Sequence, residues 1–322
     1  MRVFVTGASG FVGSALGCAL KSKDGVDSVV GLVREERAGL GFATRTAGNL
    51  FEGSHWRESL DGADVVIHLA ARAHVLNDGH EDPLTEFRRV NVDGSLRVAE
   101  AALKAGVKRF VFVSSIGVNG NQTLTSPFNE LTPPAPVSDY AVSKWEAEQA
   151  LSRFFSGTGV ELVIVRPPLV YAGHAPGNFQ RLLWLVARGL PLPFGAVDNQ
   201  RSMIALENLV DFLICCARHP DASGETFLVS DGEDCSLSEI LALLAQGMRK
   251  RLVQLPFPLV LLQGVARLFG KRALVDQLCE SLQVDSNKSR ELLGWQPKVS
   301  ARDALIDSGR SYARLVSKQS KL

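Results

Sequence analysis

The chain has 322 residues, with 35 Lys and Arg against 34 Asp and Glu, so its formal net charge at pH 7 is +1. This balance offers no general attraction for nucleic acid or for an anionic surface, and we expect no nucleic-acid partner. The length suits one large α/β unit with a smaller appended region. Five scattered cysteines without a CxxC spacing predict reduced, buried thiols, with neither a disulfide framework nor a metal site.

Two apolar segments bear on targeting. The first apolar run of the chain stops at Gly7, which is too early for a secretory signal, so we expect a cytoplasmic protein. Prolines, a glycine and Arg267 interrupt the stretch from Leu255 to Phe269, which is therefore too short to span a membrane. We favour an amphipathic helix that covers part of the core there; a helix that rests on a membrane or a partner is the alternative.

Short apolar runs alternate with helical patterns through the first half of the chain. Strands are expected at 3–6, 29–33, 65–69, 110–114 and 162–165, and helices at 11–21, 84–102 and 140–155. Near-continuous apolar strands that are separated by helices indicate a parallel sheet covered on both faces. The predicted fold class is therefore α/β, with a doubly wound parallel Rossmann sheet.

After Arg166, loops rich in proline and glycine replace this alternation. One more strand is expected at 226–229, and the SxxE pattern from Ser236 to Glu239 predicts a capping box that opens a helix. We predict a dinucleotide-binding Rossmann domain over 1–166, with a return at about 205–232. A smaller C-terminal mixed α/β region over 167–204 and 233–322 would bind the substrate.

The first predicted strand runs directly into a glycine-rich turn, TGASGFVG, and then into a helix. A dinucleotide pyrophosphate needs a tight turn, a backbone without Cβ obstruction and free N–H groups at a helix N-terminus. The alternative is a purely structural glycine turn. The residues predicted to contact the cofactor here are Gly7, Ser9, Gly10, Phe11, Val12 and Gly13.

The end of the second strand bears on which dinucleotide binds. It reads Val33-Arg34-Glu35-Glu36-Arg37, and an arginine at this place suits the 2′-phosphate of NADP, whereas a carboxylate suits the ribose of NAD. Arg34 therefore favours NADP over NAD. If Arg34 and Arg37 are instead neutralised by the two glutamates, the choice of cofactor is relaxed.

Tyr140 and Lys144 lie four residues apart on a predicted helix, so they project from the same face. A nearby ammonium favours the phenolate and lowers the pKa of a tyrosine, which suits Tyr140 to proton exchange with a substrate oxygen during hydride transfer. Ser115 closes the fifth strand, at the sheet edge where such folds bind ligands, and can bond the same oxygen. Asn91, in the preceding helix, can bond backbone there.

Taken together, these segments resemble the extended short-chain dehydrogenase/reductase family. The resemblance is carried by TGASGFVG, HLAA from His68, Asn91, VSS ending at Ser115, YAVSK from Tyr140 and RPPLVY from Arg166. It implies that Ser115, Tyr140 and Lys144 are catalytic, and that Tyr140, Lys144 and Asn91 also serve the cofactor site. Further cofactor contacts that it implies are Leu69, Ala70, Ala71, Pro167 and Val170. Asn49 and Leu50 stand where the family usually has an Asp-hydrophobic pair beside adenine.

Within that family, the chain is most similar to bacterial reductases of UDP-linked 4-keto-6-deoxy-N-acetylhexosamines that serve surface polysaccharide (O-antigen) synthesis. The likeness implies that Asn178 and Arg201 contact the UDP-sugar together with Ser115 and Tyr140. The family's second phosphate-binding arginine is not evident, and Arg272 is the candidate substitute. The helices around 84–104 and 140–156 have faces that suit a homodimer, as is common in the family.

Three functions are weighed for such a chain. The first is an NAD(P)H-dependent reductase that delivers hydride to C4 with Tyr140 as general acid, which Arg34 favours because a reductant must exchange. The alternative is a UDP-glucose or UDP-N-acetylglucosamine 4-epimerase that retains NAD. The remote alternative is a non-catalytic nucleotide-binding sensor or scaffold, since a fold alone does not establish chemistry.

Overall fold

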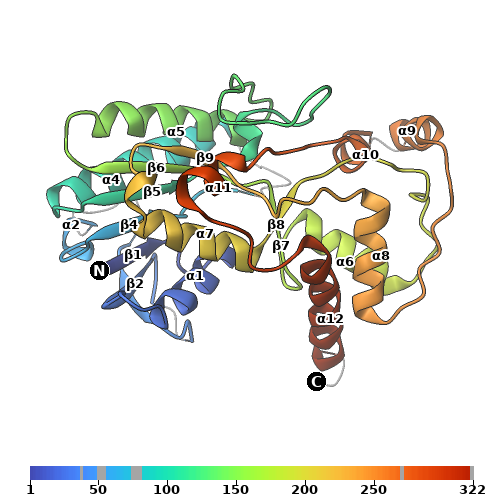
Figure 1. Ribbon diagram of the computed structural model, residues 1–322, viewed down its shortest axis with the longest axis horizontal. Coiled ribbons are helices and arrows are strands. Elements are labelled where there is room, and N and C mark those ends of the chain that lie inside the picture. The colour runs from blue at the N-terminus through green and yellow to red at the C-terminus, as the bar shows by residue number, and fades with distance from the viewer. Residues whose placement is uncertain (37–38, 49–55, 74–81, 269–271, 320–322) are drawn as a thin grey trace.

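The computed structural model describes residues 1–36, 39–48, 56–73, 82–268 and 272–319. Within these residues, a parallel sheet with the strand order β3-β2-β1-β4-β5-β6-β9 forms one end of the molecule, and a second, mostly helical region forms the other (Figure 1). The large sheet consists of β1 (Arg2–Thr6), β2 (Ser28–Val33), β3 (Ala43–Thr46), β4 (Val65–His68), β5 (Arg109–Val113), β6 (Glu161–Arg166) and β9 (Thr226–Leu228). The α/β doubly wound prediction is confirmed.

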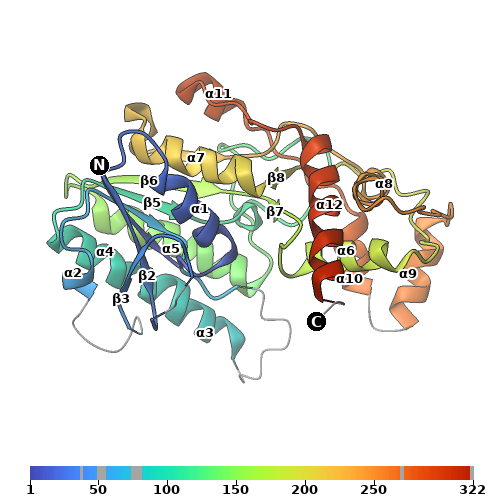
Figure 2. The same ribbon diagram turned by 90° about the horizontal axis from the view of Figure 1, so that it is seen from below.

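Helices cover both faces of this sheet, as Figure 2 shows from below. Val3 and Val5 of β1 pack in one core with α1 (Phe11–Lys21) and α7 (Leu206–Arg218). Phe4, which points the other way, packs in the opposite core with α2 (Trp56–Ser59), α4 (Gly94–Lys104) and α5 (Asp139–Phe155). Successive side chains of a strand alternate between faces, so a continuous apolar run requires cover on both.

The edge strand of the sheet and the helix expected at 84–102 both differ from the sequence-based expectation. Ala43–Thr46 forms the edge strand β3, which the pattern did not indicate because its Thr and Arg side chains are largely exposed and not alternately apolar. The helix expected at 84–102 is divided into α3 (Pro83–Arg88), a π-helical turn at Arg89–Asp93 and α4. Such π turns occur often at functional sites.

The smaller region contains β7 (Leu169–Tyr171) paired with β8 (Met203–Ala205). Its helices are α6 (Asn178–Arg188), α8 (Leu237–Met248), α9 (Leu259–Leu268), α10 (Arg272–Cys279) and α12 (Ala301–Gln319). The helix α11 (Asn287–Leu293) returns to the large sheet, where Leu293 packs in the same core as α7. The expected capping box is present, because Ser236 Oγ accepts from Glu239 N at 3.2 Å and Glu239 Oε2 accepts from Ser236 N at 2.8 Å. Within the described ranges, no helix combines the length and apolarity that crossing a bilayer requires.

A buried polar cluster joins the two regions. The Tyr171 hydroxyl of β7 donates to Asp231 Oδ2 at 2.8 Å, and Asn208 Nδ2 of α7 donates to Asp231 Oδ1 at 2.7 Å. Desolvation raises the pKa of Asp231 above its ordinary value. Because buried polar groups need partners, this cluster ties the end of β9 to both regions.

All five cysteines are free thiols. Cys216, Cys235 and Cys279 are buried as expected, but Cys18 is exposed and Cys215 is only partly buried. The expectation of uniformly buried thiols is therefore wrong for Cys18. This residue lies on the outer side of α1, where its Sγ is within 3.4 Å of Leu40 O.

Candidate active site

The glycine turn after β1 leaves no room for side chains. Gly7 has φ +65°, and a Cβ added there would lie 2.8 Å from Ala70 N. A Cβ on Gly13 would lie 2.2 Å from Gly7 O. The helix α1 begins directly after Gly10 without a side-chain cap. This bare, close-set backbone at a helix N-terminus fits a dinucleotide pyrophosphate.

The segment 69–72, which faces this turn, is held by a threonine at the end of β1. The hydroxyl oxygen of Thr6 accepts from both Leu69 N and Ala70 N at 3.1 Å. Thr6 Oγ1 also lies 2.7 Å from His68 Nδ1. Thr6 therefore holds together the glycine turn and the segment 69–72, which are both predicted to contact the dinucleotide.

His68 continues the same hydrogen-bond chain on its other side. Ser95 Oγ donates to Asn91 O at 2.6 Å, so it accepts at 3.0 Å from His68 Nε2–H. His68 Nδ1 is then the acceptor for the Thr6 hydroxyl. Burial lowers the pKa of His68 to about 3, and the nearby charge of Lys144 adds to this lowering. The imidazole is therefore neutral and held in one tautomer.

Asn91 lies in the π-helical turn, and its side chain extends this series of hydrogen bonds to α5. Its side chain accepts from Arg72 N at 2.8 Å and donates to Ser143 Oγ at 2.9 Å. The Ser143 hydroxyl in turn donates to Tyr140 O at 2.8 Å. Asn91 thus binds backbone, as the sequence predicted, and joins segment 69–72 to the first turn of α5.

Tyr140 lies in that first turn, where Ser138 caps the helix by accepting from Ala141 N at 3.2 Å. The Tyr140 ring packs edge-on against Phe87 of α3, with ring centroids 6.2 Å apart. Burial raises the pKa of Tyr140 to about 12. The lowered pKa expected from the Lys144 spacing is therefore wrong for this structure, because desolvation disfavours the phenolate.

Lys144 is buried one turn further along α5. Its Nζ lies 4.3 Å from the centroid of the Phe112 ring of β5. Desolvation lowers the pKa of Lys144 to about 7, and the carboxylate of Glu148 partly opposes this change. Glu148 in turn forms a buried ion pair with Arg166, in which Arg166 Nε donates to Glu148 Oε1 at 2.9 Å and Arg166 Nη2 donates to Glu148 Oε2 at 2.5 Å. Lys144 therefore titrates close to neutral pH, unlike an ordinary lysine.

Ser115 lies between β5 and a short 3₁₀ turn, Ile116–Val118. Its Oγ accepts from Gly117 N at 3.1 Å. A Cβ on Gly117 would be 3.4 Å from Ser115 Oγ and 3.2 Å from the Cβ of Ala141, the neighbour of Tyr140. The structure thus brings Ser115 beside the beginning of α5. Pro167 joins this loop as well, since its carbonyl accepts from Ile116 N at 3.0 Å.

The residues expected to contact substrate lie in the smaller region. Asn178 is the first residue of α6. Arg201 is partly buried between two segments, pairing with Cys235 and with Leu282, and donates to Glu280 O at 2.8 Å. Burial lowers the pKa of Arg201 from its ordinary value.

Several predicted positions are exposed or fall outside the structure's description. Arg34 follows β2 and is exposed to solvent. Val170 lies in β7, partly buried against the core beneath α1. Arg37, Asn49 and Leu50 lie outside the described residues, as does the side chain of Arg272.

Sequence reasoning missed the contributions of Thr6, His68, Ser95, Ser143 and Glu148, although His68 stood in a recognised motif. A histidine at the end of a fully apolar strand was the available signal, because a buried imidazole requires partners.

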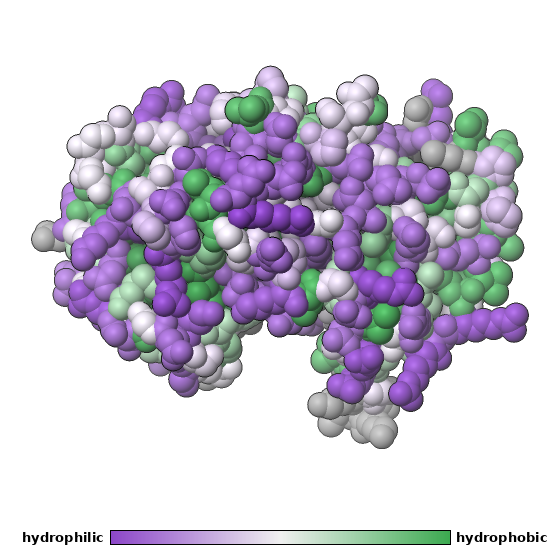
Figure 3. Space-filling view, viewed as in Figure 1, coloured by the Kyte–Doolittle hydropathy of each residue, from purple (hydrophilic) through white to green (hydrophobic). Residues whose placement is uncertain are grey.

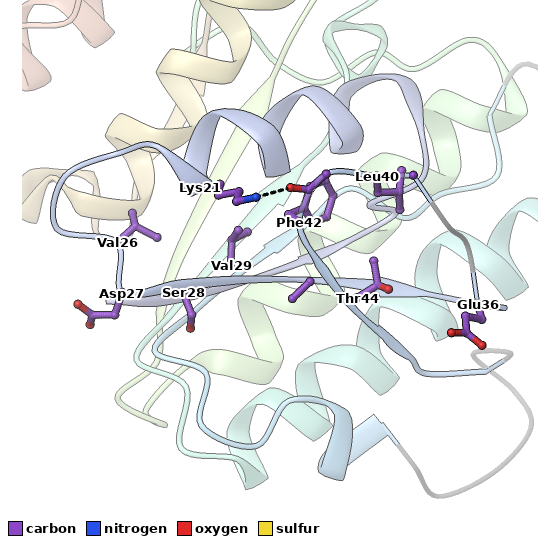
Figure 4. A pocket seen from close by; sticks show the side chains of 12 residues that line it. Lys21, Val26, Asp27, Ser28, Val29, Glu36, Leu40, Phe42 and Thr44 are labelled. Atoms are coloured by element: carbon purple, nitrogen blue, oxygen red, sulfur yellow. Dashed lines mark hydrogen bonds between the residues drawn. The ribbon is translucent and has the colours of Figure 1, made fainter.

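A shallow groove between the end of α1 and strands β2 and β3 is a separate feature (Figure 4). It is lined in part by Lys21, Val29, Phe42 and Thr44, and Lys21 Nζ donates to Gly41 O at 2.9 Å. Because α1 begins at the glycine turn, its far end lies about 15 Å away. The groove is therefore distinct from the predicted catalytic site.

The fold and this constellation define a Rossmann-type oxidoreductase, in which a dinucleotide cradle lies beside a partly buried tyrosine and a buried lysine. Residues 3–230 match the NAD dependent epimerase/dehydratase family, and the chain belongs to that family. It is thus an enzyme of the extended short-chain dehydrogenase/reductase type, with NAD as its cofactor. The non-catalytic alternative is set aside. The preference for NADP inferred from Arg34 stays a prediction.

Two relatives of this chain and one similar solved structure are named as 4-epimerases. It is 40% identical over 314 residues to a UDP-glucose 4-epimerase of Vibrio cholerae, covering 96% of this chain and 95% of the relative. It is 29% identical over 304 residues to an N-acetyl-alpha-D-glucosaminyl-diphospho-ditrans,octacis-undecaprenol 4-epimerase of Escherichia coli O157:H7, covering 89% and 88%. The solved UDP-glucose 4-epimerase of Thermotoga maritima with UDP-glucose has a TM-score of 0.77 at 23% identity, covering 98% and 100%, which supports the fold.

Proposed function

We propose that the chain is a 4-epimerase of a UDP-linked hexose, either UDP-glucose or UDP-N-acetylglucosamine, and that it retains NAD through the reaction. The observation that carries the proposal is the placement of partly buried Tyr140 and buried Lys144 on α5, which hydrogen bonds through Ser143 and Asn91 tie to the dinucleotide cradle. The 40% identical relative named UDP-glucose 4-epimerase supports the choice of reaction. Epimerisation therefore replaces reduction as the favoured function.

Each catalytic side chain has a distinct task. NAD, held at the glycine turn from Gly7 to Gly13, would supply a reversible hydride acceptor for C4 of the sugar. Tyr140 exchanges the proton of the C4 oxygen, and Ser115 hydrogen-bonds the same oxygen. Lys144, with a pKa of about 7, supplies a positive charge that stabilises the Tyr140 phenolate when that proton leaves.

Both directions of proton transfer are needed in this reaction. With a pKa raised to about 12, Tyr140 is neutral in the free protein, so it must release that proton to solvent before it can accept one from the C4 hydroxyl. The proton taken from this hydroxyl is then the one that Tyr140 returns to the 4-keto intermediate. Removal of a proton from the substrate requires the phenolate, whose stability depends on Lys144. The pair therefore suits a reversible reaction in which the same group acts first as base and then as acid.

The smaller region would hold the UDP-sugar. We assign Asn178 to the diphosphate or sugar because it opens α6, whose N-terminus has no side-chain cap. We assign Arg201 to a phosphate oxygen, since a planar guanidinium matches the geometry of phosphate oxygens. Arg272 remains the candidate for a second phosphate contact.

The experiment that tests this proposal incubates purified protein with UDP-glucose and, separately, with UDP-N-acetylglucosamine, without added cofactor. Formation of the galacto isomer supports the epimerase, and a spectrum of bound NAD in the purified protein supports retention. No isomer from either sugar, with full occupancy by NAD, would contradict it. Isomerisation of undecaprenyl-diphospho-N-acetylglucosamine, but of neither UDP-sugar, would show that the chain is a 4-epimerase whose sugar is linked to undecaprenyl diphosphate and not to UDP.

The second candidate is the NAD(P)H-dependent reductase of a UDP-linked 4-keto-6-deoxy-N-acetylhexosamine in O-antigen synthesis. The observation in its favour is the exposed Arg34 after β2, where a 2′-phosphate of NADP would be recognised. Incubation with the 4-keto sugar and NADPH or NADH distinguishes it. Stoichiometric oxidation of the added cofactor establishes the reductase, and absence of oxidation removes it.

We also propose a cytoplasmic homodimer that uses the exposed faces of the helices at 84–104 and 140–156. Light scattering coupled to size exclusion tests the stoichiometry. A monomer at micromolar concentration would contradict it.

A further inference from the structure

The helix α9 exposes a one-sided apolar face. Among the α9 side chains that the structure describes, the exposed ones follow the spacing i, i+1, i+4, i+7 and i+8, which is a single side of a helix. They are Val260, Leu261, Gly264, Arg267 and Leu268. Val260 is 78% exposed, Leu261 is 56% exposed and Leu268 is 84% exposed. Folding of the chain leaves these large apolar side chains in contact with water.

The opposite side of α9 attaches the helix to the protein. Leu262 packs against the core of the smaller region. Gln263 Nε2 donates to Asp276 Oδ1 of α10 at 2.9 Å. The helix is thus anchored by one side, and its apolar exposed face points away from the contacts that hold it.

The segment before α9 extends this face. Val253, Leu255 and Phe257 are also exposed, so six of the fifteen most exposed large apolar side chains of the described residues lie within 253–268. In Figure 3, apolar atoms gather at the end of the molecule where Figure 1 places α9. We call this set the α9 surface: Val253, Leu255, Phe257, Val260, Leu261 and Leu268. Apolar exposure that is concentrated in this way marks an interaction surface.

The charge of the same stretch is strongly one-sided. Between Glu239 and Asp276 the sequence has no acidic residue and six basic ones: Arg249, Lys250, Arg251, Arg267, Lys271 and Arg272. The remainder of the chain has 29 basic residues against all 34 acidic ones. The first four of these six are exposed. The near-neutral total therefore conceals a cationic stretch of sequence, in which Arg267 lies on α9 itself and Arg251 lies two residues before Val253.

We propose that the α9 surface docks on an anionic phospholipid bilayer. The apolar side chains would enter the boundary between headgroups and acyl chains, and the flanking cations would contact lipid phosphates. A second copy of this chain fits less well, because a twofold contact would bring the same cationic segments together. Charge complementarity therefore selects the lipid surface.

The docked helix is connected to the substrate side of the molecule. The chain that leaves α10 runs alongside Arg201, whose guanidinium donates to Glu280 O at 2.8 Å, and Ser202 N donates to Leu282 O at 2.8 Å. Docking would therefore hold the smaller region, with its candidate UDP-sugar contacts, against the membrane.

The test is flotation of the full chain with vesicles of phosphatidylglycerol and phosphatidylethanolamine, compared with vesicles of phosphatidylcholine alone. We expect the bound fraction to be about 10-fold higher on the anionic vesicles and to fall with rising salt. Equal binding to the two vesicle types, or none, would overturn the proposal.

The matched variants are the triple change Val260→Asp, Leu261→Asp and Leu268→Asp, and the control Leu131→Asp, at a site that is 90% exposed in the other region. The triple change should lower vesicle binding about 10-fold or more, whereas the control should leave it unchanged. Unchanged circular dichroism and NAD content verify the fold of each variant. Undiminished binding by a folded triple variant contradicts the proposal.

Leu261→Trp is a second variant that does not depend on introducing charge. It should strengthen vesicle binding about 3-fold or more, since tryptophan favours the membrane interface. A dimer that the triple change dissociates, together with no vesicle binding, would identify the surface as a contact between copies and overturn the lipid proposal.

Discussion

The hydrogen-bonded chain around α5 and the α9 surface are built in opposite ways. Near α5, the polar side chains of Thr6, His68, Ser95, Asn91 and Ser143 are buried and linked to one another. At the α9 surface, large apolar side chains are exposed beside cations. A buried polar chain serves both folding and function, so substitutions there affect both. An exposed face is not needed for folding, so changes there affect only what binds it.

The largest expected effect is at Tyr140, where function separates from folding most cleanly. Tyr140→Phe removes the proton donor but keeps the ring packed on Phe87, so turnover should fall roughly 10²-fold to 10⁴-fold. Steady-state kinetics measure this, with Tyr312→Phe on α12 as the control of matched chemistry. An unchanged rate would remove Tyr140 from the mechanism.

A substitution at His68 should affect stability and cofactor binding together. His68→Leu removes the buried acceptor of the Thr6 hydroxyl and the donor to Ser95 Oγ, and should lower the free energy of unfolding by about 2 to 4 kcal/mol. The folded pKa of about 3 lies below the ordinary 6.5, so the unfolded chain binds the extra proton and stability falls as pH drops from 6.5 towards 3. Chemical denaturation across this pH window should show that the free energy of unfolding declines less steeply for the variant than for the unsubstituted chain. An identical slope would contradict the neutral imidazole.

The glycine turn offers a direct contrast with α9. Gly13→Ala places a Cβ against Gly7 O and should cost about 1 to 3 kcal/mol and reduce bound NAD. A Cβ on Gly264 meets nothing within 4 Å, so Gly264→Ala should stabilise the chain by about 0.5 to 1 kcal/mol. Thermal unfolding and the NAD content of the purified proteins measure the difference. Equal effects at the two glycines would refute the close approach at the turn.

Substitution of Lys144 should change stability in the opposite direction to Gly13→Ala. Its burial lowers the pKa from 10.5 to about 7, so the unfolded chain binds more protons between these values and stability rises with pH in that window. Lys144→Met should therefore stabilise the fold by about 1 to 3 kcal/mol at pH 7, while activity is lost. The gain should shrink towards pH 10. Denaturation at both pH values tests this, and a gain independent of pH would rule out desolvation as the cause.

Much of the fold followed from local patterns. The strands around 3–6, 29–33 and 110–114 were predicted because continuous apolar runs require burial, and α1 was predicted over the residues that it occupies, 11–21. The edge strand β3 was missed because its exposed Thr and Arg side chains carry no periodic signal. The π-helical turn was missed because its cause is tertiary: Asn91 bonds Arg72 and Ser143, which are distant in sequence.

The sequence by itself determined the glycine turn, the four-residue spacing that places Tyr140 and Lys144 on one face, and the cationic, apolar composition around α9. These depend on neighbours within a few residues. Only the tertiary structure decided the protonation of the site, because the desolvation that raises the pKa of Tyr140 and lowers that of Lys144 comes from elements such as α3 and β5. It also decided which side of α9 is buried, since a helix with apolar residues on several sides can be anchored by any of them until its neighbours are in place.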